Sequence, residues 1–581
     1  MEKEKLSDLR HSLAHLLGAA ILDLYPDAKL TLGPSIDDGF YYDAQFSSKI
    51  SLDELSTIEN KMKEILPSWK TVTHKEVSKE EALKYYSGNI FKTELINEIS
   101  DRGEKITLYT MGNFVDLCRG GHIDDLSVID PDSFKLDRIA GAYWKGNEKN
   151  PMLVRIYGLA FESKEKLNEY ENLRIESEKR DHRNVGEKMD LFYFDESIGK
   201  GLPIWLPNGN IIKEELEKWA KETEDAWEYQ RVTTPIITKE NLFYTSGHLP
   251  LYKDSMYSPI VIEDENYYIK PMNCPFHHKT FAARPKSYRD LPIRLAEYGW
   301  CHRYEDSGSL FGLMRVRGMQ MNDAHIYIQK EKAVEEFVQV IKLHEYYYKA
   351  LGINDYHMEL ALRDPSNMTK YHGNEQDWID AENMTIEAMN ISGVPYKIVH
   401  EGAAFYGPKM DFQIHSSIGR SFTASTNQLD LYMGKQFNLE YTDKDGFKKT
   451  PAIIHRAPLG THERFVGFLI EHFSGNFPTW LSPIQIAIIP VGEKHLQEAN
   501  NLAKDFKMNN IRNTIYFDNN SLGKRIHISK TMRPPYILIL GDKEIESGLL
   551  TIETRQGEKI EIKKDLLITK IIIEIKNRTN I

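Results

Sequence analysis

The chain has 581 residues, several times the length of a typical domain of about 100–200 residues, so we expect a multidomain protein. It carries 74 Lys and Arg against 86 Asp and Glu, a formal charge of −12 that argues against wholesale coating of nucleic acid but allows local RNA binding. Three cysteines are too few for a disulfide framework, which favours the cytoplasm. No segment predicts a membrane span.

Apolar residues recur at helical spacing near the start of the chain, which predicts an amphipathic helix over residues 7–25. This segment is not typical of a signal peptide, because His11 and His15 interrupt its apolar run. The two histidines stand four residues apart and therefore share one face of the predicted helix. Mixed strands and helices follow to about residue 160, and we place the first domain over 1–162.

The next segment is highly charged and has few large apolar residues, which predicts an exposed helical linker over 163–181. From 182 to 480, aromatic-rich strands alternate with helices without the regular strand–helix repeat of a parallel nucleotide-binding sheet, so we predict an antiparallel sheet. Short apolar strands and helices then alternate over 484–581, which predicts a small α/β domain. Within it, residues 521–533 hold four cations and no acid, a pattern that suits phosphate contact or an ordinary solvated face.

The segment 291–328 has charged and imidazole side chains at strand spacing. Residues two apart share a face of a strand, which pairs Arg303 with Glu305 and Asp323 with His325. The guanidinium of Arg303 can bind a phosphate through two hydrogen bonds, and a neighbouring carboxylate can orient a cation or accept from an amine. The pairs therefore favour nucleotide chemistry, with a surface ion pair as the structural alternative.

Two further segments carry candidate functional residues: one suits anion binding, and the other contains a cysteine. Arg464 stands near the start of an apolar helix that follows a glycine, where helix N–H groups and a guanidinium together form an anion site. Upstream, a strand ends near Pro235, and IKPMNCP flanks Cys274 with prolines.

Taken together, these segments resemble the three signature motifs of class II aminoacyl-tRNA synthetases, and nearly the whole chain resembles the threonyl-tRNA synthetases. The most specific segments are IKPMNCP, CHRYE, RVRG with NDAHI, EGAAFYGPKMDF and IIHRAPLGTHERF. The resemblance implies an α+β multidomain protein with an N-terminal editing domain, a class II antiparallel-sheet catalytic core and a C-terminal α/β anticodon-binding domain. It also implies a homodimer that joins threonine to tRNA(Thr), at the expense of ATP, in the cytoplasm.

One zinc ion per subunit is implied by the resemblance, held by Cys274, His325 and His455, which spacing alone would not bring together. Three protein ligands leave a position for substrate. The amine and hydroxyl of threonine can fill it together, whereas valine lacks the hydroxyl and is rejected. The threonine-binding positions implied are Met272, Asp323, Tyr406 and Gln428.

The resemblance further implies that the threonine carboxylate attacks the α-phosphate of magnesium-bound ATP to give threonyl-adenylate. Arg303 would contact the α-phosphate and Arg464 the γ-phosphate, and His248 matches a histidine of the later proton transfer from tRNA. These three are the implied catalytic residues. The implied ATP-binding positions are Arg303, Glu305, Arg315, Met319, Gln428 and Arg464.

The chain departs from the usual family pattern at two places in this core. Met321 and Asn322 stand where a glutamine and an aspartate are commoner. The run from Thr423 to Thr426 replaces a sequence close to QCGT. The departures leave undecided which adenine or substrate contacts those side chains make. We expect the core chemistry to be retained.

A second, hydrolytic site is expected, because a single methyl separates serine from threonine and gives only about 10–200-fold discrimination. The HxxxH and CxxxH pairs with DDGFYYD resemble the editing domain of bacterial threonyl-tRNA synthetases. The implied editing residues are His11, His15, Lys92, Asp116, Cys118 and His122. Residue types alone would also suit zinc, whereas the resemblance favours a metal-free site.

At the C-terminus, FDNNSLGKRI and ILGDKEIESG resemble the family's anticodon-binding domain. Asn519 and Glu544 match anticodon-contacting positions, where polar groups suit unstacked bases. His527 and Glu553 stand where arginines are familiar. We also expect the small ubiquitin-like domain that commonly precedes the editing domain to be absent.

Three other functions compete with this prediction: a synthetase for proline, serine or glycine, a catalytically silent regulator that binds tRNA-like RNA, and a free-standing zinc hydrolase. The combined zinc set and editing domain argue against the first. Arg303, Glu305 and Arg464 argue against the second, because a pure binder needs no phosphate contacts. The third leaves most of the chain unexplained.

Overall fold

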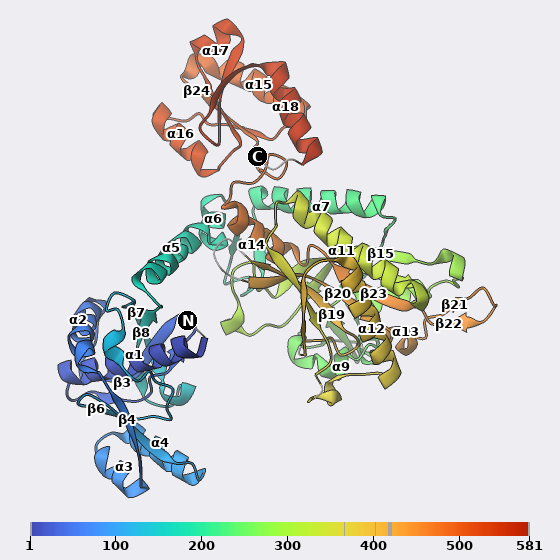
Figure 1. Ribbon diagram of the computed structural model, residues 1–581. Coiled ribbons are helices and arrows are strands. Elements are labelled where there is room, and N and C mark those ends of the chain that lie inside the picture. The colour runs from blue at the N-terminus through green and yellow to red at the C-terminus, as the bar shows by residue number, and fades with distance from the viewer. Residues whose placement is uncertain (1–2, 365, 401, 416–420, 579–581) are drawn as a thin grey trace. The chain divides into compact units, whose positions relative to one another are not determined.

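The computed structural model describes residues 3–364, 366–400, 402–415 and 421–578. The chain divides into two compact units, Met1–Ile175 and Glu176–Ile581, which are described separately (Figure 1). No helix among the described residues is long and apolar enough to cross a membrane.

The N-terminal unit is built around α1 (Lys3–Leu24), which confirms the predicted helix and begins four residues earlier than expected. Its apolar face, including Leu13 and Leu17, is fully buried against α2 (Leu55–Ile65) and β3 (Gly39–Gln45). The same burial fixes which way the polar residues of α1 point, because residues four apart project from one face.

Two antiparallel sheets complete this unit, with strand orders β1-β3-β8-β7, where β2 also pairs with β3, and β4-β5-β6. The first contains, besides β3, β1 (Lys29–Leu30), β2 (Ser35–Ile36), β7 (Phe134–Tyr143) and β8 (Met152–Ala160). The second contains β4 (Val72–Val77), β5 (Ile106–Met111) and β6 (Phe114–Leu117), with helices α3 (Lys79–Tyr85) and α4 (Ile90–Asp101).

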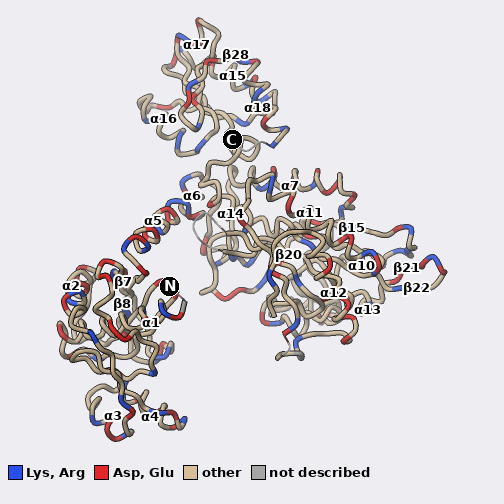
Figure 2. Tube along the Cα trace, in the orientation of Figure 1, with Lys and Arg blue, Asp and Glu red and all other residues tan. Residues whose placement is uncertain are grey.

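The charged segment after residue 162 forms α5 (Lys164–Arg180). Of the described residues of this helix, Leu167 is buried. Figure 2 shows acidic and basic residues along its length. The border between the two compact units falls within this helix, so the chain passes from one to the other through a solvated helix rather than through a packed core.

A largely antiparallel sheet forms the centre of the second unit, in the order β11-β15-β16-β23-β20-β19-β17-β18, as predicted. The pairs β11–β15 and β17–β18 are parallel. Its strands are β11 (Gln230–Arg231), β15 (Ile293–His302), β16 (Gly318–Ile328), β17 (Tyr356–Ala361), β18 (Tyr396–Val399), β19 (Lys409–His415), β20 (Ser421–Asp430) and β23 (Ala452–Ala457).

Helices pack against this sheet, and within it β23 is buried along its whole length and β16 nearly so. They are α6 (His182–Lys188), α7 (Pro207–Ala226), α11 (Ala333–Ala350), α12 (Glu375–Ser392) and α14 (His462–Phe473). Smaller elements at its edges are β9 (Phe192–Phe194), β10 (Pro203–Trp205), β12 (Ile237–Lys239), β13 (Ile260–Ile262), β14 (Glu265–Ile269), β21 (Tyr441–Thr442), β22 (Lys448–Lys449), α8 (Glu240–Thr245), α9 (His248–Leu251), α10 (Cys274–Ala282) and α13 (Met433–Gln436).

The C-terminal part has the predicted α/β character, with strand order β25-β24-β26-β27-β28 and its first three strands parallel. The strands are β24 (Ile486–Pro490), β25 (Asn513–Ile515), β26 (Tyr536–Leu540), β27 (Leu549–Thr554) and β28 (Lys559–Lys563). The helices are α15 (Leu496–Met508), α16 (Leu522–Thr531), α17 (Asp542–Ser547) and α18 (Lys564–Asn577).

The basic stretch 521–533 forms α16, but its cations do not share one role. Arg525 is buried and donates to the carbonyl oxygens of Pro490 and Val491, so it holds the fold rather than a phosphate. Lys530 pairs with Glu553, while Lys524 is exposed. The interpretation of the whole stretch as a phosphate contact is therefore wrong for Arg525, because a guanidinium taken out of water must find its partners inside the protein.

A buried charge network joins α7 to the middle of the sheet. Glu224 and Arg456 are almost fully buried and form an ion pair of 2.9 Å between Oε1 and Nη2. Asn322 donates from Nδ2 to the same oxygen at 2.8 Å, and Arg231 donates to Oε2 at 3.0 Å. The asparagine that departs from the family pattern thus supplies a donor here, where an aspartate would bring a second carboxylate to Glu224.

Replacing Glu224 by Leu should lower the free energy of unfolding by about 3–5 kcal/mol, because Arg456 would keep its charge in the interior without its partner. Urea denaturation followed by tryptophan fluorescence measures this loss. The double change Glu224→Leu with Arg456→Met should recover much of it. A single variant as stable as the unchanged protein would show that the pair contributes little.

Candidate functional site

A cavity of about 720 Å³ opens over the central sheet of the second unit. It is lined by residues of β16, β20, β23 and α14 and of the loops beside them. Every predicted zinc-, ATP- and threonine-binding residue lines it, namely Met272, Cys274, Arg303, Glu305, Arg315, Met319, Asp323, His325, Tyr406, Gln428, His455 and Arg464. Residues scattered over some 190 positions of the sequence therefore meet at one place.

The predicted zinc ligands lie together on the cavity wall. His325 on β16 and His455 on β23 are direct cross-strand partners, and Cys274 is the first residue of α10. One ligand atom from each of the three lies within 4.8 Å of the others, and all three residues are buried. One thiol and two imidazoles in this arrangement fit a zinc ion that keeps a position open for substrate.

Outer partners orient both imidazoles. The Nδ1 atoms of His325 and His277 lie 2.8 Å apart, and His277 Nε2 lies 3.0 Å from a Glu297 carboxylate oxygen. His455 Nε2 lies 2.9 Å from Asp430 Oδ2. Nε2 of His325 and Nδ1 of His455 remain for a metal. The sequence did not point to these partners, although a histidine three residues after Cys274 was a usable signal.

Burial sets the ionisation of the ligands. It lowers the pKa of His325 well below the ordinary value, so this imidazole is neutral and can bind a metal. Burial, together with the nearby Asp323 carboxylate, raises the pKa of the Cys274 thiol well above its ordinary value. A cation in the site would reverse this second effect, because a coordinating thiol is deprotonated.

Guanidinium groups also gather at the cavity wall. Arg464 lies in the first turn of α14, and burial, with Arg303 and Arg315 nearby, lowers its pKa. Its Nε donates to the carbonyl oxygen of Met314 at 3.1 Å. Arg315 pairs with Glu305 at 2.8 Å. Three clustered cations beside a helix N-terminus form an anion site of the kind that phosphates need.

Three further polar side chains of the cavity wall are held in place by their neighbours: Tyr406, Gln428 and Asp323. Tyr406 donates a hydrogen bond to Gln428 Oε1, and its ring stacks on His455 with centroids 4.9 Å apart. Asp323 accepts a hydrogen bond from Asn273 at 3.0 Å, which holds its carboxylate in place.

His248 is the predicted catalytic residue that the structure does not bring to the cavity wall. It is fully buried, with Nδ1 2.7 Å from Ser246 Oγ and Nε2 3.1 Å from the sulfur of Met272, which does line the cavity. Burial and the charge of Arg303 lower its pKa to about 3, so it is neutral at physiological pH. Its role in proton transfer stays a prediction.

The departures from the family pattern divide into two kinds. Met321 and residues of the run from Thr423 to Thr426 contribute to the cavity wall. Asn322 alternates to the other face of β16, where it bonds Glu224. The hydroxyl of Ser425 lies 2.8 Å from His344 Nδ1, toward the core.

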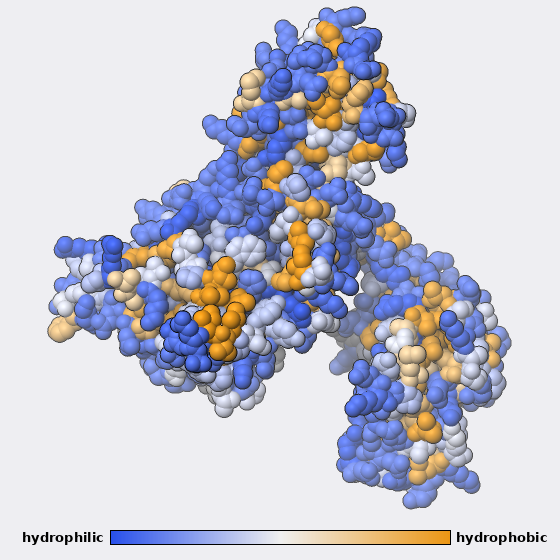
Figure 3. Space-filling model, turned by 180° about the vertical axis from the view of Figure 1, so that it is seen from behind, coloured by the Kyte–Doolittle hydropathy of each residue, from blue (hydrophilic) through white to orange (hydrophobic). Residues whose placement is uncertain are grey.

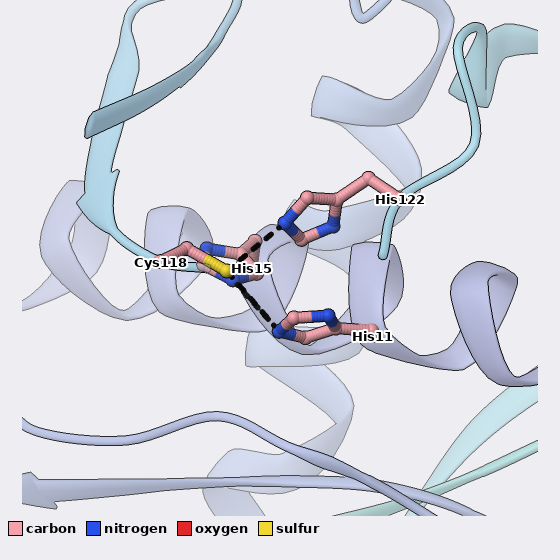
Figure 4. A group of neighbouring side chains, drawn as sticks. All are labelled: His11, His15, Cys118 and His122. Atoms are coloured by element: carbon pink, nitrogen blue, oxygen red, sulfur yellow. Dashed lines mark hydrogen bonds between the residues drawn. The ribbon is translucent and has the colours of Figure 1, made fainter. Parts of the chain in front are cut away.

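The predicted editing residues of the N-terminal unit also meet (Figure 4). His11 and His15 project from α1 toward Cys118 and His122, which follow β6. The Cys118 sulfur lies 3.5 Å from His11 Nε2 and 3.2 Å from His122 Nε2, and the Nε2 atoms of His11 and His15 are 3.3 Å apart. Among the described residues these four also form a group that could hold a metal ion.

A buried carboxylate stands behind this cluster. Asp116 is bonded by Lys92 Nζ at 2.5 Å, lies 3.1 Å from His15 Nδ1, and accepts a hydrogen bond from the hydroxyl of Tyr42. Burial works to raise the pKa of Asp116, but Lys92 and His15 hold it below the ordinary range. Tyr42 was not among the predicted residues, although it belongs to the DDGFYYD segment that signalled this domain.

Cys118 and His15 titrate in opposite directions. Burial opposes ionisation of both groups, yet hydrogen bonds from His11 and His122 lower the pKa of Cys118 to about 3. Contacts with Asp116 and Cys118 raise the pKa of His15 to about 9. The cluster therefore holds a thiolate beside an imidazolium across the neutral range.

The two predicted anticodon residues lie on different elements of the C-terminal part. Asn519 is exposed in the loop between β25 and α16. Glu544 is nearly buried in α17, and its carboxylate accepts from the Gly541 amide and from the Thr551 hydroxyl. Asn519 is thus free for a base, whereas the carboxylate of Glu544 already has partners.

The rate at which iodoacetamide modifies Cys118 should change less than about twofold between pH 5 and pH 8, because a thiolate with a pKa near 3 is already fully ionised there. An ordinary thiol would react about tenfold faster for each pH unit over this interval. Mass spectrometry locates the label, and Cys118→Ser is the control. A rate that climbs with pH would contradict the thiolate assignment.

Comparison with known proteins agrees with this geometry. Three family models match: "Threonyl and Alanyl tRNA synthetase second additional domain" over residues 106–157, "tRNA synthetase class II core domain (G, H, P, S and T)" over 257–473, and "Anticodon binding domain" over 485–574. Each covers the region where the corresponding domain is expected.

Curated relatives match over nearly the full chain. A threonine–tRNA ligase of Deinococcus radiodurans is 41% identical over 98% of this chain and 88% of its own length. One of a Sulfurihydrogenibium species is 42% identical over 99% of this chain and 90% of its own length.

Solved structures agree with the curated relatives. One is described as the RNA binding domain of threonyl-tRNA synthetase from Cryptosporidium parvum; it is 33% identical with a TM-score of 0.64, over 67% of this chain and 97% of that one. Another, a putative threonyl-tRNA synthetase from Aeropyrum pernix, is 27% identical with a TM-score of 0.60, over 69% of this chain and 96% of that one. The chain therefore belongs to the threonine–tRNA ligase family of class II aminoacyl-tRNA synthetases.

Proposed function

We propose that this chain joins L-threonine to tRNA(Thr) at the cavity of its second unit and hydrolyses Ser-tRNA(Thr) at the cluster of its first. Membership of the family supports the ligase reaction, with ATP and magnesium as the class requires. The observation that carries the residue assignment is that Cys274, His325 and His455 share one cavity with Arg303 and Arg464.

We assign one zinc ion per subunit to the cysteine and two histidines. Bound there, zinc supplies an open coordination position for the amino and hydroxyl groups of threonine. Asp323 is placed to accept hydrogen bonds from those groups, and Tyr406 and Gln428 close the same end of the cavity. Valine fits the shape but leaves these polar partners unsatisfied, so the site rejects it.

The arginines of the cavity wall supply the phosphate contacts. As the threonine carboxylate attacks the α-phosphate of ATP and pyrophosphate leaves, Arg303 and Arg464 stabilise the charge that develops. In the second step a ribose hydroxyl of tRNA attacks the adenylate. His248 is neutral and able to accept a proton, but Met272 separates it from the cavity, so this role requires Met272 to move.

We propose a metal-free editing site in the N-terminal unit. Lys92 and Asp116 are locked together in the interior and orient His15, while His11 and Cys118 face the space in which an ester would lie. The thiolate and the imidazoles can position and polarise the attacking water.

A homodimer in the cytoplasm completes the proposal. The β12-β14-β13 sheet beside the core exposes Ile237, Ile260, Val261 and Ile262. Figure 3 shows apolar side chains gathered in patches on the molecular surface. Exposed apolar side chains grouped on one small sheet favour a second copy of the chain as their cover. A silent RNA-binding regulator gains no support, because its cavity would have no use for clustered phosphate contacts.

Amino-acid-dependent ATP–pyrophosphate exchange with a zinc determination tests the synthetic site. We expect strong exchange with threonine, weaker exchange with serine, none with valine, proline or glycine, and one zinc per chain. Cys274→Ser should lower zinc content and reduce exchange by about 100-fold or more, since the polar substrate groups lose their anchor.

The matched control is Cys301→Ser, since Cys301 is equally buried but lies outside the ligand set. It should keep both zinc and exchange. Full activity in a zinc-free Cys274→Ser protein would refute the metal assignment.

Hydrolysis of Ser-tRNA(Thr) tests the editing site. Changing His11 and His15 together to Ala should slow deacylation by about 100-fold or more, the usual contribution of positioned acid–base groups, and leave aminoacylation intact. His74→Ala is the control, because His74 is an exposed histidine of the same unit. Normal deacylation by the double variant would overturn the editing assignment. A second zinc per chain would overturn the metal-free assignment.

A further inference from the structure

His182, at the start of α6, connects three segments that are far apart in the sequence. Its ring is fully buried. The backbone amide of Leu313 donates to Nε2 at 3.1 Å, and Nδ1 lies 2.7 Å from Glu471 Oε1 on α14. A backbone amide can only donate, so Nε2 is the acceptor, and Nδ1 carries the hydrogen that Glu471 receives.

The segment that His182 holds is the loop between β15 and β16, residues 303–317. Arg303, Glu305 and Arg315 of this loop line the cavity at the proposed ATP end. His182 itself does not line the cavity, so any influence on a bound nucleotide must pass through the loop.

Adjacent loop residues are fixed from two sides. The N–H of Leu313 bonds His182, while the carbonyl oxygen of Met314 accepts from Arg464 Nε at 3.1 Å. The Leu313 side chain is fully buried. The turn that carries Glu305 and Arg315 is thereby tied both to α6 and to α14, which also supplies the proposed γ-phosphate contact.

The backbone is shaped to admit the imidazole. Gly312 has φ +46°, and a Cβ there would lie 2.1 Å from His182 Nε2. On α14, a Cβ at Gly467 would lie 3.2 Å from Leu313 Cβ. Side chains at these positions would push the loop away from the ring, so the close fit depends on both glycines.

A metal at this place is a competing explanation, because Asp181, His182 and Glu471 form a group with suitable ligand types. Both ring nitrogens of His182 are already engaged, and Asp181 forms a 2.7 Å pair with Arg183. The hydrogen bonds therefore account for the cluster without an ion.

We propose that His182 is a positioning residue for ATP: it fixes the 303–317 loop through the Leu313 amide, and Glu471 fixes the ring. The inference rests on the proposed ATP site. Through His182, the short helix α6, which directly follows α5, helps to shape the proposed nucleotide end of the cavity.

Two substitutions of His182 each remove one of the two hydrogen bonds of its ring and keep the other. His182→Asn retains a donor for Glu471 but is too short to reach the Leu313 amide. His182→Gln places an acceptor near the position of Nε2 but gives up the bond to Glu471. Loss of the loop contact should raise KM for ATP in pyrophosphate exchange by about five- to tenfold, the size of one lost hydrogen bond, in the Asn variant.

In the Gln variant, KM for ATP should stay within about twofold of the unchanged protein, and so should KM for threonine in both variants. Zinc content should be unchanged. Asp181→Ala is the matched control: it removes the side-chain cap that accepts from the Arg183 amide and weakens α6, while both hydrogen bonds of the His182 ring stay in place. It should lower the melting temperature and leave KM for ATP as it was.

Equal KM for ATP in the Asn variant and the unchanged protein would overturn the inference. So would a parallel rise of both KM values in proportion to lost thermal stability, or failure of both variants to fold, since each would make His182 purely structural. These results leave exchange by the unchanged protein intact. Absence of that exchange would instead remove the proposed function, and the inference with it.

Discussion

The pairing of β16 with β23 is the constraint on which the catalytic half of the molecule depends. Its register sets His325 opposite His455 and places Arg456 beside the second histidine, pointing to the other face of the sheet. Strand alternation then separates two roles: one face carries His325 and His455 toward the cavity, and the other carries Arg456 and Asn322 into the charge network of Glu224. A one-residue slip would exchange the faces and abolish both.

The two sites share one arrangement: a buried carboxylate orients an imidazole. Glu297, through His277, orients His325; Asp430 orients His455; Asp116 orients His15. In each case a carboxylate taken out of water is held by partners that offset its desolvation, and it fixes an imidazole for the chemistry in front of it. Burial without such partners would neutralise the groups, so the interior polar residues are as much part of the sites as the residues that face substrate.

Local pattern was enough for some elements and misleading for others. The apolar spacing of α1 gave its helix and the shared face of His11 and His15, because helix geometry is a property of consecutive residues. The same kind of local reading treated Arg525 as a phosphate contact, and burial against Pro490 turned it into a structural residue. His277 and Tyr42 were missed although each stands close to a segment that signalled a site. His182 was missed because nothing in its immediate neighbours shows which distant segments will lie against it.

The sequence by itself determined the element types, the antiparallel class of the central sheet and the order of the domains, and through family resemblance it supplied the residues predicted for the sites. Tertiary structure alone decided that Cys274, His325 and His455 meet, that Asn322 faces Glu224 while Met321 faces the cavity, and that Met272 rather than its neighbour His248 lines the cavity. The physical reason is range: propensity and periodicity act over a few residues, whereas a binding site is made by strand register and packing between segments far apart in the chain.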